Sequence, residues 1–455
     1  MSFQQGLSGL NAAAKSLDVI GNNIANASTV GFKGSQAQFA DVYANSLNGA
    51  GGNQPGIGVK VAQIAQQFTQ GNVESSANPL DIAINGGGFF RTDASGTVQY
   101  SRNGQFSLDK GGFMVNAEGA KLTGYAADAS GNILASTPVP LKINSADLTP
   151  VITSQIDVSL NLDSRSVVPA ATTTPFAQIP FDTSDPTSYN KQSSLDVYDS
   201  LGNSHVMSTF YVKSSTPNTW NIYTSMDGTE INKLKAGAVA AAAPGATQAS
   251  IDAAMAAAAA KPTGTLVFAS NGVLDEAATA TAMAALTPAQ TLPMKIALPI
   301  FPATGATASI ATGMGFTGST QYGAATSEKS ATQNGYTAGH LTNFSAAADG
   351  TILGQYSNGQ AHALGQIVLA NFAAPNGLTS LGNNAWTETS ASGSPLIGVP
   401  NSGSLGVLQS STVENSNVDL TAELVNMITA QRGYHANAQT IKTQDQVLQT
   451  LVNLR

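Results

Sequence analysis

Helical periodicity is confined to the two ends of this 455-residue chain, and the sequence between them follows the pattern of β-strands and turns. Near the N-terminus, apolar residues recur at steps of three, four and seven, at Leu7, Leu10, Ala14, Leu17 and Ile24. Near the C-terminus, the same spacing runs through Leu424, Met427, Gln431, Tyr434, Ala438, Ile441, Leu448 and Val452. Such spacing places the residues on one face of a helix. We therefore predict helices over residues 2–27 and 418–455 that come together and contact something outside the β-rich body.

The predicted last helix has an unusual second face. Asp419 or Asn417 is its expected N-cap. A helix that faces water usually carries pairs of Lys and Glu, but here small, uncharged residues lie away from the apolar seam, at Thr421, Ala422, Asn426, Thr429, Ala430, Gly433, Ala436, Asn437, Thr440, Gln444 and Thr450. This face permits close approach of neighbours on several sides. A helix that lies in a groove of its own protein explains the pattern equally well.

The segments after the first helix switch to the period of strands. Residues 80–84 alternate as in a half-buried strand, Asn85-Gly86 predicts a turn, and residues 100–106 predict a hairpin with its turn at Asn103-Gly104. Residues 36–48 are compatible with another short helix. The outer part contains a predicted hairpin around Gly202-Asn203 and an Ala-rich stretch over 236–262, which we interpret as a tolerated insertion with a helix after Gly245.

Composition excludes several classes of function. Charged residues make up 10% of the chain, against about 25% in average soluble domains, and the net charge of −8 argues against nucleic-acid binding. The absence of cysteine excludes disulfides and thiolate metal sites. No stretch approaches the ~18–20 apolar residues that span a bilayer, so we expect no membrane insertion. The N-terminus lacks the features of a cleaved secretory signal.

The sequence offers little for catalysis. Residues 313–318 have the Gly-x-Gly-x-x-Gly spacing of dinucleotide sites, but the turn-and-strand pattern that follows does not predict the required helix. The four histidines have no partner at the spacing of metal ligands. We therefore predict no catalytic residue, no cofactor and no metal site.

The segment from Asn22 to Lys33, with Asn22, Asn23, Asn26, Gly31 and Phe32, resembles the signature of the flagellar rod and hook proteins. We expect Asn23 and Asn26 to bond the free carbonyls at the helix end and Gly31 to allow a sharp turn. Further blocks are similar to the same family, over residues 78–90, 100–109, 122–125 and 418–434.

The middle of the chain separates hook from rod within this family. Residues 194–203, 210–213 and Trp220 resemble the extra domain of the hook members, which a distal rod subunit would mostly lack. The resemblance therefore implies a hook subunit, with a distal rod subunit as the alternative.

The resemblance also implies a mainly β fold with terminal α-helices that pair as a coiled coil, in a chain threaded out and back. Its predicted divisions are a terminal helical domain (1–27 with 418–455), a connecting segment (28–70 with 401–417), an inner β-domain (71–145 with 334–400) and an outer β-domain (146–333). The assembly residues are those of the helical seams, namely Leu7, Leu10, Leu17, Ile24, Leu424, Met427, Tyr434, Ile441 and Leu448.

The implied function is structural. The family's subunits form a helical homopolymer outside the cell, a curved and flexible tube that transmits motor torque from rod to filament. The implied partners are rod proteins, the hook cap, the hook–filament junction proteins and the flagellar type III export apparatus, which needs no cleaved signal. The termini are expected to be disordered in the monomer. A secreted β-rich enzyme or adhesin is the rival from another class.

Overall fold

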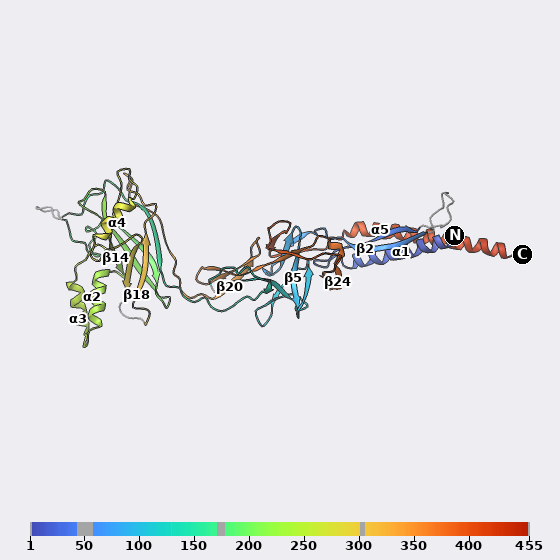
Figure 1. Cartoon of the computed structure of the whole chain (residues 1–455), viewed down its shortest axis with the longest axis horizontal. Coiled ribbons are helices and arrows are strands. Elements are labelled where there is room, and N and C mark those ends of the chain that lie inside the picture. Colours follow the sequence, from blue (N-terminus) through green and yellow to red (C-terminus); the bar gives the residue numbers. More distant parts are fainter. Residues whose placement is uncertain (1, 43–57, 129, 171–177, 301–304, 454–455) are drawn as a thin grey trace. The chain divides into compact units, whose positions relative to one another are not determined.

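The computed structural model describes residues 2–42, 58–128, 130–170, 178–300 and 305–453. The protein is mainly β, and helices α1 (Ser2–Ala25) and α5 (Leu420–Asn453) occupy the two ends of the chain (Figure 1). Both terminal helices were predicted. Asp419 caps α5, because its carboxylate accepts the backbone N–H groups of Thr421 at 2.8 Å and Ala422 at 3.2 Å.

Two compact units make up the chain. Unit 1 contains residues 1–145, 341–355 and 361–455, and unit 2 contains residues 146–340 and 356–360. The chain thus leaves unit 1 after residue 145, returns at residue 341, and enters unit 2 again only for residues 356–360. The finer division predicted from the sequence stays a prediction.

Unit 1 combines the terminal helices with short antiparallel strands. Its largest sheet has the strand order β20-β21-β22-β9-β5-β6-β25-β24, and three two-stranded sheets pair β1 with β2, β4 with β27, and β3 with β28. The strands are β1 (Ser35–Val42), β2 (Gly58–Gln66), β3 (Val73–Ser75), β4 (Ile82–Asn85), β5 (Phe89–Ala94), β6 (Thr97–Ser101), β7 (Ser107–Leu108), β8 (Met114–Val115), β9 (Lys121–Ala126), β10 (Val139–Pro140), β20 (Leu341–Ala346), β21 (Thr351–Tyr356), β22 (Ala361–Ile367), β23 (Leu369–Asn371), β24 (Thr379–Gly382), β25 (Ala385–Thr387), β26 (Leu396–Gly398), β27 (Val407–Ser410) and β28 (Thr412–Glu414).

An aromatic cluster fixes one side of unit 1. The rings of Phe89, Phe372, Trp386 and Phe68 meet edge to face, with centroids 5.3–5.9 Å apart. This geometry is favourable beyond the burial of area alone. The cluster therefore stabilises the β-part of unit 1, to which the segments next to the terminal helices are attached.

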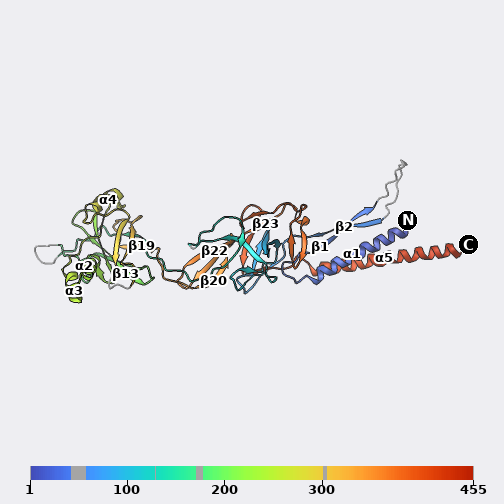
Figure 2. The same cartoon turned by 60° about the horizontal axis from the view of Figure 1, so that its bottom comes forward.

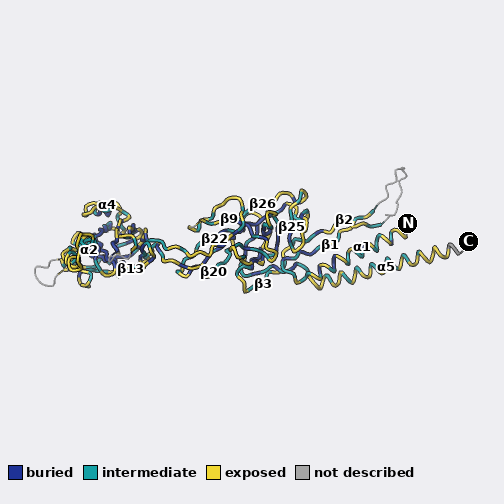
Figure 3. Tube along the Cα trace, turned by 90° about the horizontal axis from the view of Figure 1, so that it is seen from below, coloured by how far each residue is buried: buried dark blue, intermediate teal, exposed yellow. Residues whose placement is uncertain are grey.

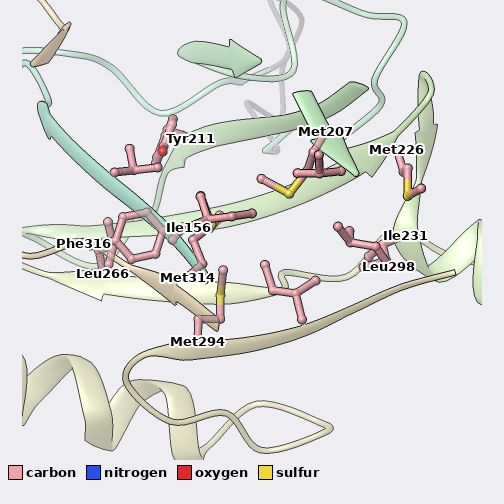
Figure 4. Close-up of a cluster of buried hydrophobic side chains, with 14 of the residues drawn as sticks. Ile156, Met207, Tyr211, Met226, Ile231, Leu266, Met294, Leu298, Met314 and Phe316 are labelled. Atoms are coloured by element: carbon pink, nitrogen blue, oxygen red, sulfur yellow. The ribbon is translucent and has the colours of Figure 1, made fainter. Parts of the chain in front are cut away.

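Unit 2 packs two sheets around one core. One sheet has the order β17-β18-β11-β19, and the other has β12-β13-β14-β15 with β16 paired to β14. The strands are β11 (Gln155–Asn161), β12 (Lys191–Tyr198), β13 (Ser204–Lys213), β14 (Thr219–Met226), β15 (Thr229–Glu230), β16 (Gly264–Val267), β17 (Met294–Pro299), β18 (Ser309–Gly315) and β19 (Ser327–Gln333), and the helices are α2 (Ile231–Ala241), α3 (Gln248–Ala257) and α4 (Glu276–Ala284). Figure 4 shows Ile156, Met207, Met294 and Met314 converging in the core.

The Tyr211 hydroxyl in this core has no hydrogen-bond partner among the described residues. Burial, reinforced by the charge of Glu328, raises the pKa of the Tyr211 phenol above its ordinary 10.0. Because the pKa of Tyr211 is higher in the folded than in the unfolded chain, ionisation of this phenol does not affect stability below about pH 10. Above that pH the unfolded chain is favoured increasingly, and the free energy of unfolding falls. We expect Tyr211→Phe to raise the free energy of unfolding by about 1 kcal/mol and to weaken this alkaline loss. Urea unfolding on both sides of pH 10 measures both effects, and a less stable variant at both pH values would contradict the expectation.

Several predicted elements of the body are confirmed. Strands β12 and β13 form the hairpin at residues 199–203, where the Asp199 carboxylate accepts the N–H groups of Leu201 and Asn203. Helix α3 lies after Gly245 in the Ala-rich stretch, although α2 was not predicted.

Three predictions were wrong in detail. Residues 35–42 form strand β1 and not a helix, because Gln36 and Gln38 alternate with inward positions against β2; residues 43–48 lie outside the described residues. Asn103-Gly104 does not turn a hairpin, because β6 pairs with β5 and β25 while β7 pairs with β8. Strand β4 is buried on both faces at residues 82–84 and not half-buried.

Candidate assembly site

Helices α1 and α5 lie side by side and run antiparallel (Figures 1 and 2). The start of α1 packs against the second half of α5. A methyl group on Gly6 would stand 3.2 Å from the Ile441 side chain, and one on Gly9 would stand 2.9 Å from the Asn437 amide. Because glycine has no side chain, these positions let the two helices approach closely.

The face of α1 that is buried differs from the predicted seam. Its buried positions include Ala12, Val19, Ile20 and Asn23. The predicted seam instead passes through Leu7, Leu10, Leu17 and Ile24. One residue along a helix is a rotation of about 100°, so the large apolar residues point to the side of the contact. Leu7 is exposed, and Leu10, Leu17 and Ile24 are half-buried.

The predicted assembly residues of α5 are likewise partly half-buried and partly exposed. Met427, Tyr434 and Ile441 are half-buried. Leu424 and Leu448 are 45% and 53% exposed. The structure thus brings only part of the predicted seam into contact within the chain, and the role of these residues in assembly stays a prediction.

A β-hairpin that the sequence did not predict covers another side of α1. Strands β1 and β2 pair antiparallel, and the N–H of Val59 donates to the Ser8 hydroxyl at 3.3 Å. Ala65 is buried, while Phe39, Val61 and Ile64 are exposed. The hairpin therefore presents apolar side chains outward beside the helix pair.

The family motif joins these elements. Asn23 is 2% exposed; its side-chain oxygen accepts the N–H of Ser35 at 2.9 Å, and its amide group donates to the Ser35 carbonyl at 2.8 Å and to the Glu423 carboxylate at 3.0 Å. The prediction that Asn23 bonds a free carbonyl at the end of α1 was wrong, because its side chain ties α1 to β1 and α5. Asn26 instead donates to the Asn22 carbonyl at 3.0 Å, as expected of a residue at a helix end. Asn22 is exposed and Phe32 is half-buried.

Gly31 makes the turn that follows. Its φ is +71°, and its N–H donates to the Glu414 carbonyl at 2.7 Å. A side chain here would stand 2.6 Å from the Asn103 backbone nitrogen. We expect Gly31→Ala to destabilise this junction by more than the roughly 1 kcal/mol of the left-handed conformation alone, because backbone must also move. Electron microscopy of the assemblies that the purified variant forms measures the effect, with Gly21→Ala as the control, since a methyl group on Gly21 meets nothing within 4 Å.

A buried ion cluster, Lys33, Arg102 and Glu414, holds the same junction. The Lys33 amine lies 2.6 Å from Glu414 Oε1, and the Arg102 guanidinium lies 3.3 Å from Glu414 Oε2. Lys33 also donates to the Thr69 carbonyl at 2.8 Å. The side chains of Lys33 and Glu414 are fully buried. The cluster therefore joins three parts of the chain that are far apart in sequence.

The electrostatics of the ion cluster are unbalanced, because two cations share one carboxylate. Burial lowers the pKa of the Lys33 amine, and Glu414 offsets part of this lowering. Burial likewise lowers the pKa of the Arg102 guanidinium, again with Glu414 opposing it. Glu414 is thus the group that makes both buried charges tolerable. Sequence reasoning missed it, and the only signal was that Lys33 and Arg102 lie inside motif blocks.

Exposed apolar residues gather on the helix pair and the hairpin. Figure 3 shows α5 exposed along much of its length. The exposed large apolar residues of these elements are Phe3, Leu7, Phe39, Val61, Ile64, Leu420, Leu424, Val425, Ile428, Val447 and Leu448. Concentration of such residues on one part of a protein marks an interaction surface.

The described residues do not suggest a catalytic or membrane site. Strand β18 ends at Gly315, and the next described element is strand β19, so residues 313–318 lack the following helix that a dinucleotide site requires. Within the described ranges, no cluster of three or more potential ligands is placed to hold a metal ion. In that part of the chain, no helix combines the length and apolarity needed to cross a membrane.

Four family models match successive parts of the chain. Residues 3–33 match the Flagella basal body rod protein, and residues 83–167 match the Flagellar hook protein FlgE/F/G D1 domain. Residues 161–336 match the Flagellar basal body protein FlaE D2 domain, and residues 409–454 match the Flagellar basal body rod FlgEFG protein C-terminal. Together they cover the terminal helices and parts of both units.

Relatives named flagellar hook protein FlgE span the whole chain. The proteins of Salmonella typhimurium and Escherichia coli K12 are 44% and 42% identical over 100% of both chains. That of Borreliella burgdorferi is 31% identical over 100% of this chain and 99% of its own. Among solved structures, the Helicobacter pylori flagellar hook protein FlgE2 is similar in fold, with a TM-score of 0.50 at 12% identity over 75% of this chain and 100% of its own.

These full-length matches do not favour the distal rod alternative. The chain therefore belongs to the flagellar hook protein FlgE family, whose members are structural proteins of the hook and not enzymes.

Proposed function

We propose that the chain polymerises head to tail into the curved, flexible helical tube of the hook, and that its terminal segments are the assembly device. Helices α1 and α5 pair as a coiled coil at the innermost radius and line the channel. The chain is threaded out and back, with the four divisions 1–27/418–455, 28–70/401–417, 71–145/334–400 and 146–333 lying progressively outward. Repeated contacts that do not close a ring generate such a tube.

The exposed apolar residues of the terminal elements carry this proposal. Leu424, Val425 and Ile428 are 45–59% exposed although they lie on one long helix. Full burial of an exposed Leu, Val or Ile side chain is worth roughly 1.5–3 kcal/mol, and about half of that is still to be gained at each of these half-exposed positions. Polymerisation supplies that neighbour, since every subunit presents the same surface. Leu7, Leu10, Leu17, Ile24, Met427, Tyr434, Ile441 and Leu448 belong to the same proposed assembly set.

The ion cluster supports a second part of the proposal. Glu414 connects the segment after α1 to the strand before α5 and to the β-part of unit 1. We therefore propose that the terminal segments are disordered in the monomer and dock on the β-part together when a subunit joins the polymer.

The proposed partners follow from the resemblance. They are identical subunits, rod proteins, the hook cap, the hook–filament junction proteins and the type III export apparatus. The proposed location is the hook outside the cell, reached without a cleaved signal. The weakly charged composition, with 10% charged residues, suits surfaces that must slide over one another.

Deletion and complementation test the function. A strain that lacks this gene is expected to make basal bodies without hooks or filaments, and the full chain is expected to restore both. Intact filaments in the deletion strain would contradict the proposal. Limited proteolysis of the soluble monomer tests the disorder of its ends, because a core of roughly residues 70–400 is expected to survive; protease-resistant ends would contradict that part.

A further inference from the structure

Helix α5 extends beyond the helix with which it pairs. It has 34 residues and α1 has 24, which correspond to about 51 Å and 36 Å. Because Gly6 packs against Ile441, few residues of α1 remain to cover α5 beyond that point. Residues 445–453, here called the overhang, therefore project past the pair, as Figures 1 and 2 show.

The overhang has the character of a segment that is buried by a partner. Val447 and Leu448 are 49% and 53% exposed. Asp445 is its only charged residue, and the rest are apolar side chains, amides and one threonine. A water-facing helix end of this length normally carries more charge.

The opposite end of the helix pair contains a groove of about 580 Å³, where α1 ends, α5 begins and strand β1 passes. Its apolar lining includes Val19, Ile20, Phe39, Val418, Ala422 and Ala430. Amide side chains line it as well, including Asn23, Asn417 and Asn426. The carboxylates of Asp419 and Glu423 line it too, and both accept hydrogen bonds within the chain. The rest of the lining is the mixture of apolar and uncharged polar groups that the overhang presents.

The dimensions of groove and overhang agree. Along α5 the groove extends from Asp419 to Ala430, about 16 Å. The nine residues of the overhang span about 13 Å. Within one molecule the two are separated by the α5 residues between 430 and 445, about 22 Å of continuous helix, so a chain does not fill its own groove.

We propose that the overhang of one subunit occupies the groove of a second copy of this chain. The two surfaces lie at opposite ends of the same helix pair, so each contact leaves one overhang and one groove free. A contact of this kind is heterologous and propagates without closing. The inference rests on the proposed function and identifies the axial contact between inner helices.

Paired cysteines test the contact, because the chain has no native cysteine. Leu448→Cys is combined in turn with Ala422→Cys, Asn426→Cys and Thr429→Cys, expressed in the deletion strain, and purified hooks are oxidised. At least one pair is expected to give a ladder of multimers on a non-reducing gel, at least tenfold stronger than either single variant. Leu448→Cys with Leu381→Cys is the matched control, since Leu381 is equally exposed on strand β24.

The outcomes separate this inference from the proposed function. Hooks that form normally but give no ladder with any groove position would overturn the overhang contact and leave the function intact. Cross-linking of Leu448→Cys to a different protein would also overturn it. If Leu448→Cys itself blocks hooks, Val447→Cys replaces it in the same double variants. Failure of the wild-type chain to form hooks would instead overturn the proposed function.

Discussion

Replacement of Glu414 by glutamine is expected to raise the concentration of free subunit in equilibrium with the hook by roughly 100-fold to several thousandfold. Removal of one partner from a buried ion pair costs about 3–5 kcal/mol, and each 1.4 kcal/mol is about a factor of ten in an equilibrium constant. The glutamine retains the shape of Glu414 but lacks the charge that Lys33 and Arg102 share. The measurement is the subunit concentration left in solution after purified chains have polymerised, supported by counts of hooks per cell.

A matched control exists on the same small sheet. Glu74 on strand β3 pairs across from Val413 and is exposed, so Glu74→Gln is expected to change this concentration less than threefold. The double variant Lys33→Met with Glu414→Gln removes one charge of each sign. It is expected to be less damaging than the sum of the single variants. Additive effects would show that Lys33 and Glu414 are not coupled in the polymer.

The second large effect is expected at the outer face of α5. Leu424→Asp and Ile428→Asp place a charge where the account buries an apolar side chain against a neighbouring subunit. The effective cost of burying an ion without a partner is several kcal/mol, so we expect at least a hundredfold rise in the free subunit concentration, and cells without hooks. The amount of subunit exported is expected to stay the same, which immunoblots of the culture medium measure.

The folded chain itself tolerates these changes. Leu424 is 45% exposed and Ile428 is 51% exposed, and exposed substitutions away from special features usually change stability by about 0.5 kcal/mol or less. Leu381→Asp on strand β24 is the control, since Leu381 is similarly exposed outside the helix pair. Normal hooks from Leu424→Asp would mean that this face of α5 is not an interface.

The terminal helices and the hairpin of strands β12 and β13 were predictable because their signals are local. Apolar spacing alone placed α1 and α5, and Gly202-Asn203 placed the turn between β12 and β13. The short helix predicted from residue 36 failed because its few apolar residues fit both periods. Pairing with β2 makes this segment a strand, and the sequence of the segment itself does not indicate that a partner strand is present.

The face of α1 that packs against α5 differs from the predicted seam for a physical reason. The sequence pattern selects the largest apolar side chains, such as Leu7 and Leu17, as the seam. The chain instead packs α1 against α5 through small residues, including Gly6 and Gly9. Under the proposed function, the large apolar residues make contacts between molecules as well as within one. The hydrophobic spacing of the sequence does not distinguish the two kinds of contact.

The ion cluster was beyond sequence reasoning for a different reason. Lys33, Arg102 and Glu414 lie in segments that only the complete fold brings together, and each looks like an ordinary surface charge in its own segment. The overall scarcity of charge, 10% of residues, hints that individual charges have structural roles. It does not indicate which cation meets which carboxylate.

A side-chain-resolved reconstruction of hooks assembled from this chain tests the central claim most directly. The account predicts that α1 and α5 form the innermost layer, that Leu424 and Ile428 are buried against neighbouring copies, and that Glu414 joins Lys33 and Arg102 in every subunit. Terminal helices on the outer surface of the tube, or Leu424 and Ile428 facing open solvent, would contradict it.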